Sequence, residues 1–250
     1  MNKLKEGIEF IRICKNWYSI LPYYVRDTLL RNCKPSESKK ILVKLRNGLK
    51  FFARARGHDL GFMIEIFHRD IYKFPKRKMH TVVDVGAHIG IFSCLAAIYA
   101  DRVIAIEPSP DNFSLLKQNI RLNGFNNVIP IQMALSDKNG ASTFFLSEYG
   151  TGDHSLIPFD TSNVIAVKTC TMERLFEIYE LDKLSFLKID CEGCEYNVLK
   201  SSRELFNRID QIVIDSHHGY TKEIAELLAK EFVVSVKGDI IYGYKRRENE

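Results

Sequence analysis

The sequence predicts an α/β protein with a mostly parallel sheet. From residue 81 onward, short β-branched runs alternate with segments of helical periodicity. The first run, residues 81–85, leads into a glycine-bounded turn over residues 86–90 and then into an apolar, helix-competent segment. Acidic residues stand at the ends of several runs. Alternating strands and helices form parallel sheets with right-handed crossovers, which bind ligands beyond the carboxyl ends of their strands.

The composition suits one large domain or one domain with an appendage. The chain has 250 residues, of which 46% are hydrophobic, as is usual for globular proteins. No apolar run approaches the ~18 residues of a membrane-spanning helix. Charged residues interrupt residues 1–24, which excludes the apolar core of a signal peptide. We therefore expect a cytoplasmic protein without a transmembrane segment.

The charge of the chain is unevenly distributed. Residues 1–80 carry 19 Lys and Arg against 7 Asp and Glu, a net charge of +12, whereas the remainder carries 17 against 24, a net charge of −7. A basic N-terminal third is suited to an anionic partner, such as a phosphorylated or lipid-linked substrate, a nucleic acid or a membrane surface. The alternative is a solvated surface that pairs with the acidic remainder.

The first forty residues are expected to form a basic helical extension. Apolar residues at helical spacing predict an amphipathic helix over residues 4–18, and Pro22 is expected to interrupt it. This helix is expected to pack on the domain or on a second subunit, with a peripheral membrane contact as the alternative. Residues 32–40 are polar and predict a linker.

A hairpin and a helix are predicted between this extension and the sheet. Strand-like runs over residues 41–46 and 49–53 flank Asn47 and Gly48, a pair that is typical of tight hairpins. Helical spacing follows over residues 60–72. We expect residues 41–80 to pack on the core.

Strand–helix units and a terminal hairpin fill the rest of the chain. Ser109 and Pro110 are typical of the first positions of a helix, and Gly124 is typical of its end. Residues 147–163 predict an irregular loop, which we interpret as a substrate lid. The remaining predicted strands cover residues 102–106, 127–133, 141–146, 164–168, 184–190, 211–215, 232–236 and 240–244, and the helices cover residues 172–179, 196–201 and 222–230.

The glycine turn favours a nucleoside cofactor without a diphosphate. The turn lacks the middle glycine of the G-x-G-x-x-G dinucleotide fingerprint, and no Lys follows it as in a phosphate-binding P-loop. S-adenosylmethionine is the common cofactor of this kind, although a two-glycine turn can also be a plain connection. Glu107 lies 21 residues after Gly86 at the end of the second strand, where a carboxylate binds ribose hydroxyls. The alternative is that Glu107 caps the following helix, a role that we assign to Ser109.

Several reactive groups are predicted to meet at one edge of the sheet. Because parallel strands end on the same side, the residues that follow them are expected to converge there. These residues are Asp84 with Gly86, Glu107, Ala134 to Ser136, Asp190 with Glu192, and Asp215 with His217 and His218.

Four segments resemble class I S-adenosylmethionine-dependent methyltransferases of the FkbM type. They are residues 83–90 (VDVGAHIG), 106–110 (IEPSP), 134–137 (ALSD) and 187–195 (LKIDCEGCE), and the last is the most specific to the group. The similarity covers residues 41–245. It implies a Rossmann-like sheet of seven strands with an antiparallel last strand, and a catalytic domain over residues 81–250.

The resemblance also implies the cofactor-binding residues. Gly86 and Gly90, with Ala87 and His88 between them, would shape the turn around the methionine part, although the His88 ring lies at a variable position. Asp84 would orient the turn, Glu107 would hold the ribose, backbone near Ala134 would flank the adenine, and Asp190 would face the sulfonium. Cys191 and Cys194 fall at variable positions, which argues against a redox or zinc role for this C-x-x-C pair.

FkbM-type enzymes are similar to O-methyltransferases that act on hydroxyls of sugars and natural products. A hydroxyl acceptor requires a base, for which His217 is our first candidate and Asp190 and Glu192 are the alternatives. These three residues also suit a divalent metal that would acidify the hydroxyl. An RNA methyltransferase that uses the basic N-terminal third and a catalytically degenerate binding module are the competing hypotheses.

Overall fold

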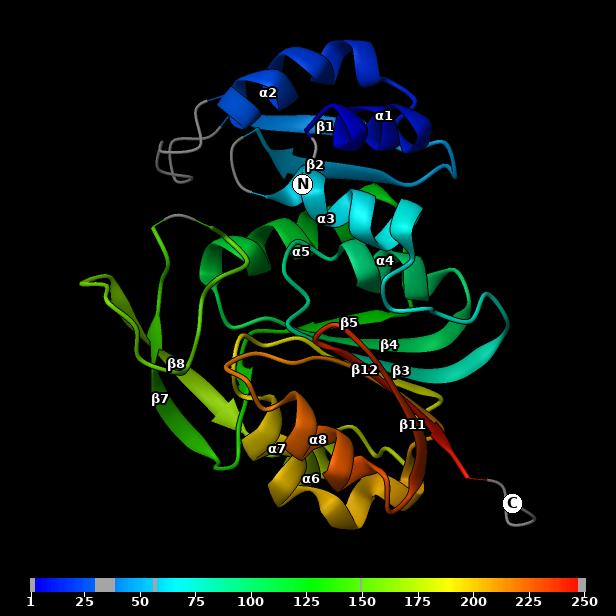
Figure 1. Ribbon diagram of the computed structural model, residues 1–250, viewed down its shortest axis with the longest axis vertical. Helices are drawn as coiled ribbons and strands as arrows, with labels where there is room; N and C mark the ends of the chain where they lie inside the picture. The colour runs from blue at the N-terminus through cyan, green and yellow to red at the C-terminus, as the bar shows by residue number, and fades with distance from the viewer. Residues whose placement is uncertain (1–2, 30–38, 56–57, 149, 247–250) are drawn as a thin grey trace.

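A seven-stranded sheet forms the centre of the structure (Figure 1). The computed structural model describes residues 3–29, 39–55, 58–148 and 150–246. The strand order is β11-β12-β10-β9-β3-β4-β5. These strands are β3 (Met79–Val85), β4 (Ala100–Ile106), β5 (Val128–Ile131), β9 (Phe186–Ile189), β10 (Gln211–Asp215), β11 (Phe232–Lys237) and β12 (Ile240–Lys245).

The strand order reverses direction at β3. Val83 is the register partner of Ile104 in β4 and of Leu187 in β9, and both pairings are parallel. The chain therefore runs from β3 outward to β5 and then returns to the other side of β3. The place where the strand order reverses is called a switch point. In open α/β sheets a ligand-binding crevice forms there, beyond the carboxyl ends of the strands.

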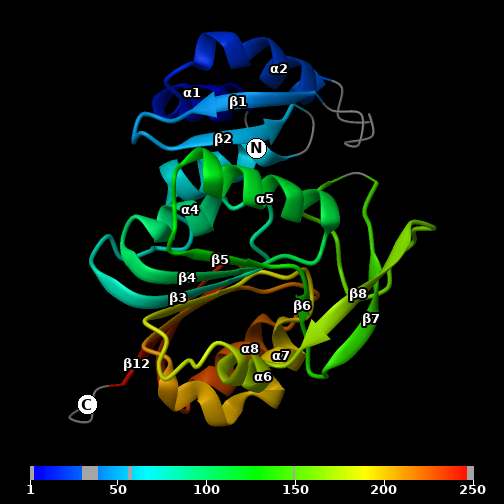
Figure 2. The ribbon, with the colours of Figure 1, turned by 180° about the vertical axis from the view of Figure 1, so that it is seen from behind.

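Helices cover both faces of this sheet, as Figures 1 and 2 show. The helices α4 (Ile91–Ala97) and α5 (Pro110–Leu122) lie on one face. The other face carries α6 (Met172–Ile178), α7 (Glu195–Ser201), the 3₁₀ segment η3 (Arg203–Arg208) and α8 (Thr221–Leu228). Neighbouring strand residues alternate between the two cores, so that Val82 packs in one and Val83 in the other.

The edges of the fold confirm the predicted topology. The last strand, β12, is antiparallel to both β10 and β11, as the resemblance implied. A separate sheet, in the order β6-β8-β7, lies beside the central one (Figure 2). Its strands are β6 (Ala134–Leu135), β7 (Gly140–Phe145) and β8 (Val164–Cys170).

An N-terminal layer lies over α4 and α5. It contains α1 (Lys3–Ile13), α2 (Trp17–Leu29), the hairpin of β1 (Lys40–Lys44) and β2 (Lys50–Arg54), α3 (Asp59–Ile64) and the π-helical turn η2 (Glu65–Arg69). The hairpin forms around Asn47 and Gly48 as predicted. The predicted linker, residues 32–40, falls mostly outside the described residues.

The predicted position of the N-terminal helix break is wrong. Pro22 lies inside α2, and the chain turns earlier, between α1 and α2. The reason is a tertiary contact, because the Asn16 side chain accepts a hydrogen bond from the Lys44 backbone N–H (2.8 Å) and donates one to the Leu42 carbonyl (2.9 Å). The end of α1 is therefore tied to β1, a contact that local sequence does not reveal.

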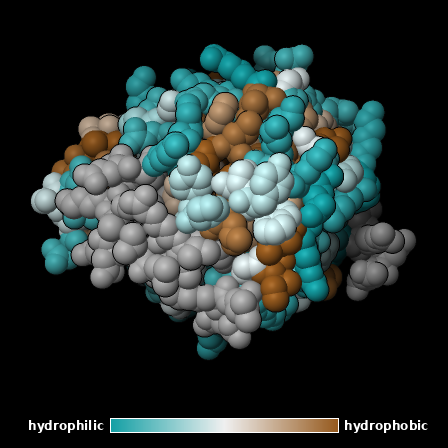
Figure 3. Space-filling view, turned by 90° about the horizontal axis from the view of Figure 1, so that it is seen from above, coloured by the Kyte–Doolittle hydropathy of each residue, from teal (hydrophilic) through white to brown (hydrophobic). Residues whose placement is uncertain are grey.

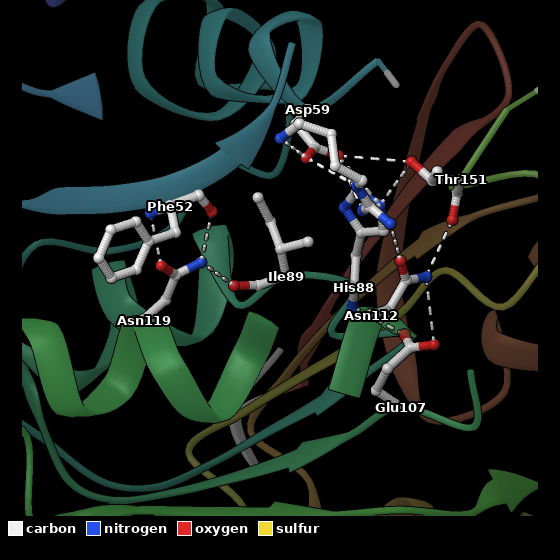
Figure 4. Close-up of polar contacts among 9 residues, drawn as sticks. Phe52, Asp59, His88, Ile89, Glu107, Asn112, Asn119 and Thr151 are labelled. Carbon is white, nitrogen blue, oxygen red and sulfur yellow. Dashed lines mark hydrogen bonds and ion pairs between the residues drawn. The ribbon is translucent and has the colours of Figure 1, made fainter. Parts of the chain in front are cut away.

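Asn119 of α5 and Asn123, the C-cap residue of that helix, attach the hairpin to the core. The Asn119 amide exchanges hydrogen bonds with the backbone N–H (2.7 Å) and carbonyl (3.1 Å) of Phe52, and Asn123 does the same with Lys50 (2.8 and 2.7 Å). These side chains satisfy the open edge of β2, which would otherwise present unpaired backbone groups. Asn119 also donates to the carbonyl of Ile89, within the glycine turn (2.8 Å; Figure 4).

The outer surface of the N-terminal layer mixes apolar and polar side chains, as Figure 3 shows. Ile8 and Tyr18 are 48% and 70% exposed. Among the described residues, no helix has the length and apolar character required to cross a membrane.

Candidate active site

The glycine turn after β3 brings two strand ends into contact. Gly86 has φ +75°, and a Cβ at this position would lie 1.7 Å from the backbone oxygen of Asp190. Gly90 has φ +86°, and its Cβ would lie 2.6 Å from the Leu116 side chain. A larger residue at Gly86 would push β3 and β9 apart, so this glycine shapes the crevice at the switch point.

A buried lysine holds the turn from below. Lys188, in β9, places its Nζ 3.1 Å from Asp84 Oδ1, 2.9 Å from the Gly86 carbonyl and 3.6 Å from Asp190 Oδ2. Asp84 is fully buried and also accepts a hydrogen bond from Ser93 Oγ (2.5 Å). Desolvation lowers the pKa of Lys188, but the charges of Asp84 and Asp190 outweigh it and raise that pKa. Lys188 is therefore a cation that fixes the turn to both strands.

Glu107 stands at the end of β4, beside the turn. Its carboxylate accepts hydrogen bonds from the backbone N–H of His88 (2.8 Å) and of Ser109 (2.9 Å), and from the Asn112 amide (3.4 Å). Burial raises the pKa of Glu107 to about 7 in spite of these donors. A carboxylate has about four acceptor positions, so some remain for hydroxyl groups.

The structure corrects the assignment of the α5 cap. Ser109 occupies the N-cap position, but its side chain makes no capping hydrogen bond. Glu107 instead accepts the Ser109 N–H, so this carboxylate both contacts the helix start and lines the pocket. A contact with the start of α5 and a position in the pocket are therefore compatible for Glu107.

A polar network connects the hairpin to Glu107 (Figure 4). Arg54 forms an ion pair with the buried Asp59 (3.0 Å) and donates to Asn112 Oδ1 (2.8 Å). Asn112 in turn donates to Glu107 and to the Thr151 carbonyl (2.9 Å). The network joins β2, α5 and the predicted lid around a single carboxylate.

The His88 ring is neutral and has a defined tautomer. Burial and then the Arg54 charge hold the pKa of His88 well below its usual range. Its Nε2 lies 3.0 Å from Arg54 Nη2, which can only donate, 3.1 Å from Thr151 Oγ1 and 3.4 Å from Asp59 Oδ1. Because the arginine is the nearest of the three, we assign the proton of the ring to Nδ1. Nδ1 is buried without a partner among the described residues, and His88 lines the pocket. This ring therefore has a free donor for a ligand, whereas the resemblance placed it at a variable position.

One pocket collects all the predicted cofactor-binding residues except Asp84 and Gly90. Gly86, Ala87, His88, Glu107, Ala134 and Asp190 all line it. Asp84 lies beneath the turn on Lys188, and Gly90 packs against α5. Met133, Leu135 and Phe144 give the pocket an apolar wall beside Ala134, which suits the flat face of a base.

Two of the three predicted reaction groups, Asp190 and Glu192, line this pocket, whereas His217 is not among its lining residues and contacts Glu192 instead. Asp190 accepts a hydrogen bond from the Tyr72 hydroxyl (2.6 Å), and Glu192 Oε2 lies 3.4 Å from His217 Nε2. His217 Nδ1 lies 2.9 Å from Glu195 Oε1, which also accepts the backbone N–H groups of Cys191 (3.1 Å) and Gly193 (3.0 Å). Glu195 is 1% exposed, so it anchors both the turn after β9 and the imidazole.

The charges around His217 favour its imidazolium form. Desolvation lowers the pKa of His217, but the hydrogen bond with Glu195 and the charges of Glu192, Glu195 and Asp190 raise it to about 10. Burial and the Asp190 charge raise the pKa of Glu192 to about 8, although His217 lowers it. The neutral imidazole that we expected from the sequence is therefore not the favoured form at pH 7.

The same residues have the spacing of a metal site. One ligand atom from each of Asp190, Glu192 and His217 lies within 4.8 Å of the others. The neighbouring pair, Cys191 and Cys194, forms a disulfide with Cα atoms 5.8 Å apart. We did not predict this bond, because the resemblance marks both positions only as variable. It closes the turn that carries Glu192.

Several residues of the site escaped the sequence analysis. Lys188 stands inside the most specific motif, where a lysine in an otherwise apolar strand was an available signal. Tyr72 contacts Asp190 from 118 residues away, and Arg54 contacts Asn112 from 58 residues away. No local pattern predicts such contacts.

Comparison with known proteins identifies the family. Residues 84–234 match the methyltransferase FkbM domain. The hexuronic acid methyltransferase AglP of Haloferax volcanii is 30% identical over 174 residues, which cover 67% of this chain and 70% of AglP. Methyltransferase 1 of Beauveria bassiana is 24% identical over 213 residues, which cover 70% of this chain and 83% of that protein.

A solved structure supports the fold. The FkbM methyltransferase of Methylobacillus flagellatus KT matches 96% of this chain with a TM-score of 0.50 at 15% identity. This chain spans 58% of the length of that structure. With the domain match over residues 84–234, these findings show a class I, Rossmann-like fold and an enzyme. The chain belongs to the FkbM methyltransferase family.

Proposed function

We propose that this methyltransferase uses S-adenosylmethionine to methylate a hydroxyl of a sugar, a glycan or another small acceptor. The observation that carries the proposal is the pocket at the β3–β9 switch point, where Glu107 stands on one side and Asp190 and Glu192 stand on the other. The name of the Haloferax relative, a hexuronic acid methyltransferase, supports a sugar-like acceptor.

The residues present suit this cofactor. Glu107 would accept hydrogen bonds from the ribose hydroxyls, and the apolar wall beside Ala134 would cover the adenine. The unpartnered Nδ1–H of His88 gives a further donor, and Asp190 gives a carboxylate for the amino end. When bound, S-adenosylmethionine supplies a methyl group whose C–S bond breaks as the acceptor O–C bond forms, which releases S-adenosylhomocysteine.

We assign the proton transfer to Glu192. The acceptor hydroxyl must lose its proton, and a base with a pKa near the working pH serves best. Glu192 has a pKa of about 8 and lines the pocket, whereas His217 already holds its proton at pH 7. The His217 imidazolium, 3.4 Å from Glu192, stabilises the ionised carboxylate that accepts the proton. Glu195 keeps the imidazolium in place through its 2.9 Å hydrogen bond.

The test combines a labelled methyl group with a chelator. The full chain is incubated with S-adenosylmethionine carrying a ¹³C-methyl group, a mixture of neutral glycosides and EDTA, and products are identified by NMR. We expect methyl ethers, and a loss of at least about 10²-fold in turnover for Glu192→Gln, the usual range for removal of a general base. If turnover stops in EDTA and returns with Mg²⁺, the hydroxyl is activated by a metal bound to Asp190, Glu192 and His217 and not by Glu192 acting as a base. Labelled N-methyl or C-methyl products would contradict hydroxyl transfer.

A further inference from the structure

A second cavity adjoins the reaction side of the cofactor pocket. It has a volume of ≈540 Å³ and lies between the predicted lid and the turns after β9 and β10. Glu192 lines both this cavity and the cofactor pocket, so the two spaces share the residue to which we assign the base. An acceptor held in this cavity would present its hydroxyl to Glu192.

The cavity carries charge of one sign. Asp153 and Asp160 line it with exposed carboxylates, Glu148 also lines it, and the charge of Glu192 is offset by His217, whose Nε2 lies 3.4 Å away. His218 is the one residue of basic type among the described lining residues. The lining therefore contains neither Lys nor Arg in the part of the chain that the structure describes. A carboxylate or phosphate on the acceptor would lie near Asp153 and Asp160 without a guanidinium or ammonium partner from the described residues, and such juxtaposition of like charges rejects a ligand.

The remaining lining suits a hydroxylated ring. Ser162 and Thr161 contribute hydroxyl groups, and carboxylates accept hydrogen bonds from ligand hydroxyls. Phe159 is 37% exposed and gives an apolar face for the C–H side of a sugar. The cavity thus combines hydrogen-bond acceptors with one aromatic surface.

We infer that this chain methylates an uncharged or amino-bearing polyhydroxylated acceptor and discriminates against sugars that carry a carboxylate. The inference rests on the proposed function and narrows its acceptor class. It separates this chain from its Haloferax relative, whose name specifies a hexuronic acid. The charge of residues 81–250, a net −7, points the same way. The basic residues of the N-terminal third are absent from the described cavity lining.

The test compares three glycosides that differ in one substituent. Methyl glucoside, methyl glucosaminide and methyl glucuronide are titrated into the full chain saturated with S-adenosylhomocysteine, and binding is followed by ligand-observed NMR. We expect the neutral and amino glycosides to bind at least about tenfold more tightly than the glucuronide, because two nearby carboxylates of the cavity repel the carboxylate of the glucuronide. The double variant Asp153→Asn, Asp160→Asn should reduce this gap about tenfold. Both residues are exposed, so the variant is expected to fold.

Glu223→Gln removes an exposed carboxylate on α8, outside the cavity, and should leave the ranking unchanged. A glucuronide that binds as well as the glucoside would overturn the inference. So would the failure of all three glycosides to bind while S-adenosylhomocysteine binds normally. Failure of S-adenosylhomocysteine itself to bind would instead overturn the proposed function.

Discussion

At the scale of the residue, the site depends on charges that occupy defined protonation states. Lys188 is a buried cation between Asp84 and Asp190, and His217 is an imidazolium between Glu192 and Glu195. The sequence predicted the carboxylates at the strand ends because parallel strands end at one edge. It did not predict the state of His217, because that state depends on Glu195, which the fold places against it.

The pH dependence of turnover tests the assignment of the base. Glu192 accepts a proton only when ionised, so kcat/KM should rise about tenfold per pH unit up to about pH 8 and then level. It should fall as pH approaches about 10, where His217 loses the proton that stabilises Glu192. Glu192→Gln should abolish the rising limb. If Glu192→Gln keeps a rise in kcat/KM with a midpoint near pH 6.5, the base is a neutral His217 and not Glu192.

At the scale of the element, α5 connects three parts of the molecule. Its first turn carries Asn112 against Glu107, a later turn carries Asn119 against β2, and its C-cap residue Asn123 also binds β2. The bounds of α5 were predictable from Ser109, Pro110 and Gly124, and the structure has them at these positions. The attachment of α5 to β2 was not predictable, because the sequence does not show which backbone groups an asparagine side chain will bind.

Asn119→Ala should destabilise the whole fold. The change removes three hydrogen bonds, two with the partly buried backbone groups of Phe52 and one with the buried carbonyl of Ile89. Each such group left unpaired costs about 1–3 kcal/mol, so we expect a loss of about 3 kcal/mol or more in the free energy of unfolding. Urea denaturation measures this loss. Gln118→Ala on the same helix, whose amide is exposed, is the control and should change stability by less than about 0.5 kcal/mol. Equal effects of the two variants would contradict the role of Asn119.

At the scale of the whole molecule, the N-terminal layer is part of the support of the site. Phe10 is 1% exposed, and Arg69 joins η2 to Glu9 in α1 (2.7 Å). The layer reaches the pocket through Arg54, whose partners are Asp59, Asn112 and His88. The α/β class followed from patterns within residues 81–245, and the antiparallel last strand followed from the family resemblance. The order of the strands and the packing of residues 3–69 depend on contacts between distant segments. The predicted basic extension is thus also a structural layer.

Calorimetric titration of S-adenosylhomocysteine into the wild-type protein and into Glu107 variants tests the central claim most directly. We expect one site in the wild type, about 10²-fold weaker binding in Glu107→Ala, because hydrogen bonds to a charged acceptor are lost, and unchanged binding in the exposed control Glu223→Ala. Glu107→Gln keeps one carbonyl acceptor and should bind with intermediate affinity, which also covers the case in which the alanine variant does not fold. Wild-type affinity in both Glu107 variants, or no binding by the wild type, would contradict the account.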